Sequence, residues 1–150
     1  MVDAETERFT IGVFQDVAWA QKGVDALKQA GFPAELLTIL MKDGPDGGPF
    51  IERALGAAAQ RVELAGIGTA LGRGPLVATL GAGDLQKLGL SGTMRRVGFQ
   101  SHDSRIFDAL TGRGGVLVAI QSESRAADAL AILHSYGGGN AAIGAWTGRV

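Results

Sequence analysis

The stretch FTIGVFQDVAWAQKGVDALKQAGFPAELLTILM, residues 9–41, decides the fold. Its first residues, Phe9 to Val13, alternate apolar side chains with small or polar ones, which is typical of a half-buried strand. Asp16 precedes an apolar stripe at spacings of four and three, and this pattern predicts a helix capped by that carboxylate. Gly31 ends the helix, because glycine adopts a left-handed conformation without a Cβ clash. Leu36 to Met41 supply a second strand, so the stretch predicts a β-α-β unit.

The same pattern recurs near the carboxyl end, in residues 115–147. Placing Gly31 over Gly137 gives an offset of 137 − 31 = 106. At that offset apolar residues match apolar residues: Ile11 meets Leu117, Phe14 meets Ile120, Ala20 meets Ala126 and Leu27 meets Leu133. Two such units usually pair their strands into one antiparallel sheet with both helices on one face. We therefore expect an α+β fold, a ferredoxin-like pair of β-α-β units, although two unrelated units of similar composition would look alike.

Residues 42–114 lie between the two units as a glycine-rich, mainly helical insertion within a single domain of residues 1–150. Its first part predicts a loop and then a helix over 50–60, and Val62 and the residues after it look extended. Pro75 suits the first turn of a short helix, because its missing amide is unpaired there in any case. Further helices are expected over Asp84 to Val97 and from a capping Ser101 to Leu110.

Composition excludes several classes of protein. The fourteen basic residues are scattered among fifteen acidic ones and the net charge is −1, so nothing indicates a nucleic-acid partner. The chain contains no cysteine, which excludes disulfides and thiolate chemistry. Residues 1–8 carry three acidic residues and no apolar run, which favours a cytoplasmic location over secretion. The segment 64–83 contains few charged residues, but Arg73 and the many glycines disfavour contact with a membrane.

Several segments together resemble the bacterial general-stress protein family, the YflT and general stress protein 17M-like domain. They are the helix that ends Ala-Gly-Phe-Pro within Phe14 to Leu40, the Gly-Ile-Gly and Gly-Pro-Leu-Val-Ala motifs within Gly66 to Ala78, Val97-Gly98-Phe99, and Gly-Gly-Val-Leu-Val over Gly114 to Val118. The resemblance implies a small cytoplasmic, stress-associated protein of undefined biochemical activity. It supplies no catalytic residues.

Residues with recognisable chemistry are few. The glycines of 66–83 lack the G-x-G-x-x-G spacing of a dinucleotide site, so no cofactor is expected. His102 and Asp103 suggest a hydrolase, but neighbours at a helix start point in different directions, and helix capping is the better interpretation. Metal sites usually gather three or four ligands, so none is expected here. The residues considered for a ligand site or an interface are Gly66, Gly68, Arg73, Gly74, Pro75, Trp19, Trp146 and His102.

Three classes of function remain open. The leading hypothesis is a non-enzymatic binding or assembly module acting in stress physiology. The alternative is a small-molecule sensor, with a ligand held between the sheet and the insertion near Gly66 to Pro75. An enzyme built on His102 and Asp103, or a membrane-associated glycine-rich protein, is less favoured. We also expect a homodimer, because a sheet of this type leaves one face and its edges open, and Ile11 and Ile120 put apolar side chains on its opposite faces.

Overall fold

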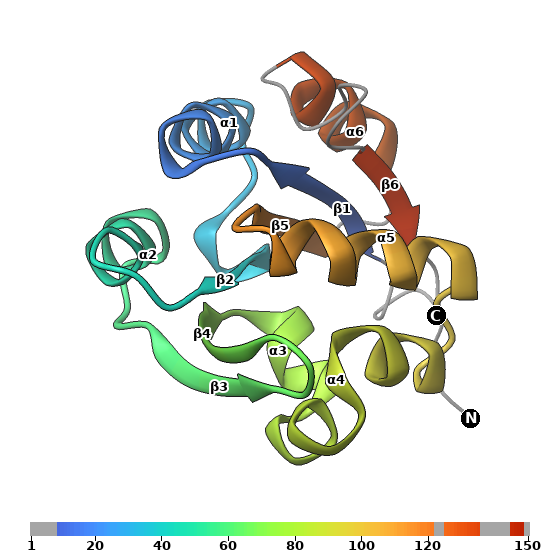
Figure 1. Cartoon of the computed structure of the whole chain (residues 1–150). Coiled ribbons are helices and arrows are strands. Elements are labelled where there is room, and N and C mark those ends of the chain that lie inside the picture. Colours follow the sequence, from blue (N-terminus) through green and yellow to red (C-terminus); the bar gives the residue numbers. More distant parts are fainter. Residues whose placement is uncertain (1–8, 122–124, 136–144, 149–150) are drawn as a thin grey trace.

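Strands β1 (Phe9–Phe14) and β5 (Val116–Gln121) come from the two ends of the chain and lie side by side in the sheet (Figure 1). The structure is a computed structural model that describes residues 9–121, 125–135 and 145–148. The β1–β5 pair is antiparallel, and Val13 faces Leu117 across it. The prediction that both terminal units contribute to one antiparallel sheet is confirmed.

The sheet contains six strands within the described residues. The other four are β2 (Leu37–Lys42), β3 (Gln60–Leu64), β4 (Gly68–Arg73) and β6 (Ala145–Gly148). Their order is β3-β4-β2-β5-β1-β6, and every neighbouring pair is antiparallel. β3 and β4 form a hairpin that belongs to the insertion and extends the sheet beyond β2. The insertion is otherwise mainly helical, and its extended part continues the sheet of the terminal units.

Helices cover both faces of this sheet. The helices on one face are α1 (Val17–Gln29), α2 (Gly47–Leu55) and α6 (Ala126–Ser135), and those on the other are α3 (Pro75–Leu80), α4 (Ala82–Arg96) and α5 (Ser101–Gly112). A short 3-10 turn, η1 (Ala34–Leu36), precedes β2. Side chains alternate between two apolar clusters along the central strands, because successive residues of a strand point to opposite faces. The arrangement has three layers, and the insertion supplies the helices of one outer layer.

This second layer removes one of the two reasons for which a homodimer was expected, namely the open face. Ile11 and Val13 pack in the cluster beneath α3, α4 and α5, whereas Val118 and Ile120 pack in the cluster beneath α1, α2 and α6. All four side chains are fully buried within one chain. The assumption of an open sheet face was wrong, because the insertion folds back over that face.

The two terminal units place equivalent residues in equivalent environments. Ile11 and Leu117, which match at the 106-residue offset, share the cluster beneath α3, α4 and α5. Leu27 and Leu133 match in the same way and share the cluster on the opposite face. The likeness of the two units in sequence is thus accompanied by a likeness in side-chain orientation.

Helix α1 begins and ends as its sequence predicts. The carboxylate of Asp16 accepts a hydrogen bond from the backbone amide of Trp19 at 2.9 Å, which confirms the predicted cap. Gly31 has a φ of 97° just past the helix, and the amide of Phe32 donates to the carbonyl of Leu27 at 3.1 Å. These contacts satisfy carbonyls of the last turn in a Schellman motif.

Two other helix boundaries differ from the prediction. α2 spans Gly47–Leu55 and not residues 50–60, because it begins inside the glycine-rich loop and Gly56, with a φ of 71°, ends it. Ser101 is the first residue of α5 and not its cap. The cap position belongs to Gln100, whose backbone is extended and whose side chain makes no capping bond. The amide and hydroxyl of Ser104 both donate to the carbonyl of Gln100.

Helix α4 is interrupted at Gly89. The backbone there has a φ of 75° and a ψ of 179°, and a Cβ would lie 2.8 Å from the carbonyl oxygen of Ala65. Hydrogen bonds then stabilise the second half of the helix: Thr93 donates to the carbonyl of Gly89, and Ser91 donates its amide to the carboxylate of Asp108 on α5.

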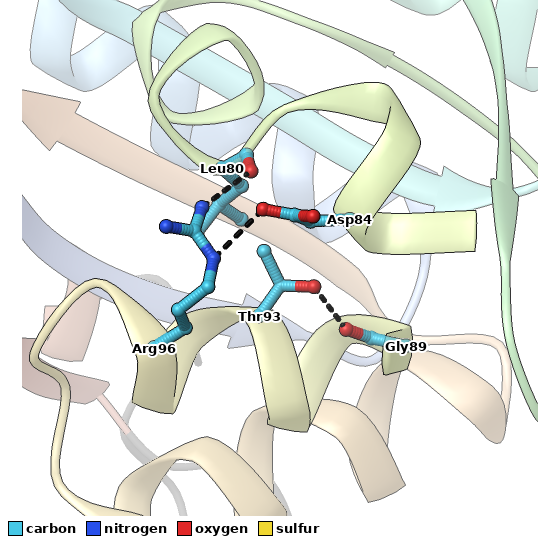
Figure 2. A network of polar contacts seen from close by, with 5 residues as sticks. All are labelled: Leu80, Asp84, Gly89, Thr93 and Arg96. Atoms are coloured by element: carbon cyan, nitrogen blue, oxygen red, sulfur yellow. Dashed lines mark hydrogen bonds and ion pairs between the residues drawn. The ribbon is translucent and has the colours of Figure 1, made fainter. Parts of the chain in front are cut away.

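An arginine near the end of α4 ties this helix to α3 (Figure 2). Arg96 forms an ion pair of 2.7 Å with Asp84 in the first turn of α4. Its guanidinium also donates to the carbonyl of Leu80, the last residue of α3. The short connection between the two helices is therefore spanned by side-chain contacts as well as by the chain.

Helix α3 is attached to the sheet at its first residues. Pro75 occupies the first helical position, as predicted. Gly74 has a φ of 128° and lies so close to β2 that a Cβ would come within 2.4 Å of the carbonyl oxygen of Leu37. The amide of Leu76 donates to the hydroxyl of Thr38 on β2 at 2.9 Å. The strand thus supplies the cap that the helix cannot obtain from a glycine.

The close approach at Gly74 predicts a large cost for Gly74→Ala. An alanine would combine a backbone conformation that only glycine adopts readily with a clash against β2, and we expect the free energy of unfolding to fall by about 2–4 kcal/mol. Denaturant unfolding measures this. Gly83→Ala, at a helical position where a Cβ meets nothing within 4 Å, is the control and should be neutral or stabilising. An equal loss of unfolding free energy in the two variants would contradict the close contact between Gly74 and β2.

The cap from Thr38 predicts that Thr38→Val lowers the free energy of unfolding by about 1–2 kcal/mol, because the buried amide of Leu76 loses its acceptor. The matched variant is Thr10→Val. Thr10 is also a buried strand residue, but its hydroxyl has no hydrogen-bond partner within the described residues. That substitution should leave stability unchanged or raise it. The same denaturation experiment compares the two, and an equal response would rule out the cap.

Candidate functional site

An open cavity of about 500 Å³ lies beside the start of α3. Three stretches that are separate in sequence form it: η1 with the start of β2, the end of α2 with the start of β3, and the end of β4 with the first turns of α3. Pockets that hold small ligands usually measure about 300–1,000 Å³. The size of this cavity is within that range.

Apolar residues form part of the cavity wall. Leu37, the first residue of β2, is fully buried, while Leu55 and Pro75 are partly exposed. Ala78 lies one turn further along α3 and is exposed. The contact between Gly74 and β2 positions this wall, because it holds the first turn of α3 against the end of the sheet.

Three residues give the cavity polar groups. Arg73, the last residue of β4, is half-buried, and its Nη1 donates to the carbonyl of Ala58 at 3.0 Å. Glu35 of η1 and Gln60 of β3 also line the cavity and are exposed. Arg73 and Glu35 carry opposite charges, and no ion pair joins them within the described part of the chain. The cavity therefore presents a cation, an anion and an amide beside apolar side chains.

The structure brings together three of the residues considered from the sequence: Arg73, Gly74 and Pro75 all line the cavity. Gly66 and Gly68 do not, because they form the turn at the opposite end of β4. At about 3.3 Å per residue, that turn is roughly 17 Å from Arg73 along the strand. The φ angles of Gly66 and Gly68 are 84° and 107°, so both serve the hairpin turn. The turn contacts α4, where Ala65 donates its amide to the carbonyl of Leu85.

The remaining candidates lie elsewhere. Trp19 is on α1 and 38% exposed, with the ammonium of Lys22 4.6 Å from its ring centroid. The backbone of Trp146 pairs with Ile11 in the sheet, and its side chain is outside the described part of the structure. His102 is an exposed residue in the first turn of α5.

His102 and the half-buried Asp103 next to it line neither of the two cavities described in this section. The catalytic role considered for the pair stays a prediction without support from a neighbouring cavity. No group of three or more histidine, aspartate or glutamate residues is close enough to hold a metal ion among the residues that the structure places. In the same residues, no helix is long and apolar enough to span a membrane.

A smaller cavity, of about 150 Å³, lies between α1 and α2. Arg53 and Gln21 line it, and the guanidinium donates to the side-chain carbonyl of Gln21 at 3.1 Å. This volume is below that of most ligand pockets. The hydrogen bond between Arg53 and Gln21 joins α2 to α1, so we interpret it as a contact between the two helices.

Sequence reasoning missed Glu35, Gln60 and Leu55 as residues of the cavity. They lie on separate elements and belong to no spacing pattern, so they meet only through the fold. Arg73 could be singled out from the sequence because it is the only charged residue in the glycine-rich segment 64–83.

Comparisons with protein-family models, with curated proteins and with solved structures found no match. The resemblance to the general-stress family accordingly stays a prediction drawn from the sequence.

Proposed function

We propose that the chain is a non-enzymatic binding module that holds a small molecule in the cavity beside Arg73. The observation that carries this proposal is the composition of that cavity, which sets Arg73, Glu35 and Gln60 beside the apolar side chains of Leu55 and Pro75. Small-molecule sites are concave, mostly apolar, and contain a few convergent polar groups that orient the ligand. This combination agrees with the small-molecule sensor that was the alternative hypothesis.

The position of the cavity supports a sensing role. Its lining comes from η1 and β2 of the first terminal unit and from β4 and α3 of the insertion. A ligand that contacts both parts would stabilise their association, because binding to the folded state alone raises the free energy of unfolding. The resemblance to the general-stress family supports placing such a module in stress physiology.

We further infer that the terminal units form a ferredoxin-like core. The strand order β2-β5-β1-β6, antiparallel throughout, and the position of α1 and α6 on one face support this assignment. The insertion then adds a hairpin at one edge and three helices over the second face.

The assembly role has less support than ligand binding. Both faces of the sheet are covered within the chain, and the outer strand β3 exposes Gln60, Arg61 and Glu63. Charged side chains on an edge strand disfavour pairing with another chain. A homodimer therefore remains a prediction that rests on neither an open face nor an apolar edge at β3.

The variant Ala78→Phe tests the binding proposal. A phenylalanine on this exposed position of α3 would fill the cavity without disturbing the core, so the unfolding temperature of the free protein should change little. In a thermal-shift screen of small metabolites, ligands present at about 100 times their Kd stabilise the wild type by about 2.7 kcal/mol. We expect those shifts to disappear in the variant.

The control is Ala109→Phe, an exposed helical alanine of α5 that does not line the cavity. It should retain every ligand-induced shift. A screen without any stabilising compound, or shifts that persist in Ala78→Phe, would contradict ligand binding in this cavity and favour the assembly role.

A further inference from the structure

We propose that the ligand of this cavity is a zwitterion, an aliphatic α-amino acid whose carboxylate pairs with Arg73 and whose ammonium group pairs with Glu35. This inference rests on the proposed function, since it names the chemistry of the ligand at the same site. It follows from the charges, the hydrogen bonds and the apolar wall of the cavity.

Arg73 suits the carboxylate end of such a ligand. A guanidinium carries five N–H donors in a planar fork that matches both oxygens of a carboxylate. The bond from its Nη1 to the carbonyl of Ala58 holds the group on one side, and it has no ion-pair partner within the described residues. The half-buried position of Arg73 reduces screening by water, which strengthens a charge-assisted hydrogen bond.

Glu35 and Gln60 suit the ammonium end. Glu35 lies on η1 and lines the same cavity, and its carboxylate is an acceptor for N–H donors. Gln60 adds an amide, which both donates and accepts. Because one cation and one anion line the same cavity, a ligand that carries both charges can form two charge-assisted contacts, whereas a ligand with one charge can form only one. The pair therefore selects for a neutral molecule that carries both charges.

The apolar wall selects the side chain of the amino acid. Leu55, Pro75 and Ala78 offer hydrocarbon surface and no hydrogen-bonding side-chain groups. A branched aliphatic side chain can bury its surface against them, whereas a polar one would lose hydration without gaining a partner. We expect leucine, isoleucine or valine to bind better than serine or aspartate.

The test uses isothermal titration of the full chain with L-leucine and two analogues that each lack one charge. L-leucinamide keeps the ammonium group and loses the carboxylate, and 4-methylpentanoate keeps the carboxylate and loses the ammonium group. We expect each analogue to bind the wild type about 10- to 100-fold more weakly than leucine, the range for hydrogen bonds to charged groups.

Two variants test which residue binds each charged group of the ligand. In Arg73→Gln, leucine should lose affinity and the preference for leucine over leucinamide should disappear. In Glu35→Gln, the preference for leucine over 4-methylpentanoate should disappear while the preference over leucinamide remains. The matched controls are Arg61→Gln and Glu52→Gln, exposed residues outside the cavity lining, which should behave as the wild type. Circular dichroism and the unfolding temperature verify that each variant is folded.

The outcomes separate this inference from the proposed function. If none of leucine, isoleucine and valine binds at millimolar concentration, or if the analogues bind as well as leucine, the zwitterion is wrong. Should other compounds then stabilise the wild type but not Ala78→Phe, the cavity is a ligand site of different chemistry and the proposed function stands. When no compound at all distinguishes the wild type from Ala78→Phe, both proposals fail.

Discussion

The contact between Gly74 and strand β2 is the constraint on which the rest of the structure depends. It brings the insertion within van der Waals distance of the first terminal unit, where the carbonyl of Leu37 leaves no space for a Cβ. The bond from the Leu76 amide to the Thr38 hydroxyl then fixes the direction of α3. Because Arg96 ties the end of α3 to α4, and Asp108 on α5 accepts from Ser91 of α4, one contact orients the whole outer layer of the insertion.

This layer determines where the chain can bind anything. With helices on both faces, the apolar side chains of the central strands are used inside the molecule. The polar groups of the larger cavity lie near the ends of strands, where loops and helix starts meet. Arg73 lies at such an end, and the side chains around it come from both parts of the chain. Binding of a small molecule thus agrees better with the architecture than association through the sheet does.

Local signals in the sequence were sufficient for much of the fold. Asp16 and Gly31 define α1 because a carboxylate cap and a left-handed glycine act within a few residues of the chain. Pro75 marks the start of α3 for the same kind of reason. Ser101 was wrongly expected to cap α5, since Gln100 takes the extended backbone of the cap position.

The rest of the fold and the cavity depend on contacts between segments that are distant in sequence. Thr38 is an ordinary strand residue until α3 is placed beside it, so no periodicity indicates that it caps a helix. The covered second face escaped prediction for a similar reason, because the helices that cover it lie in the insertion and not in the terminal units. Glu35 and Gln60 become neighbours of one cavity only when η1, β3 and β4 are in place.

Hydrogen exchange of the Leu76 amide, followed by NMR on the native protein, tests the attachment of α3 to β2 most directly. The first amides of a helix have no partner within the helix and ordinarily exchange rapidly. A buried bond to Thr38 predicts that the amide of Leu76 exchanges as slowly as those of β2 and β4. Exchange at the rate of an exposed first-turn amide would contradict the account, because α3 would then not be held against the sheet.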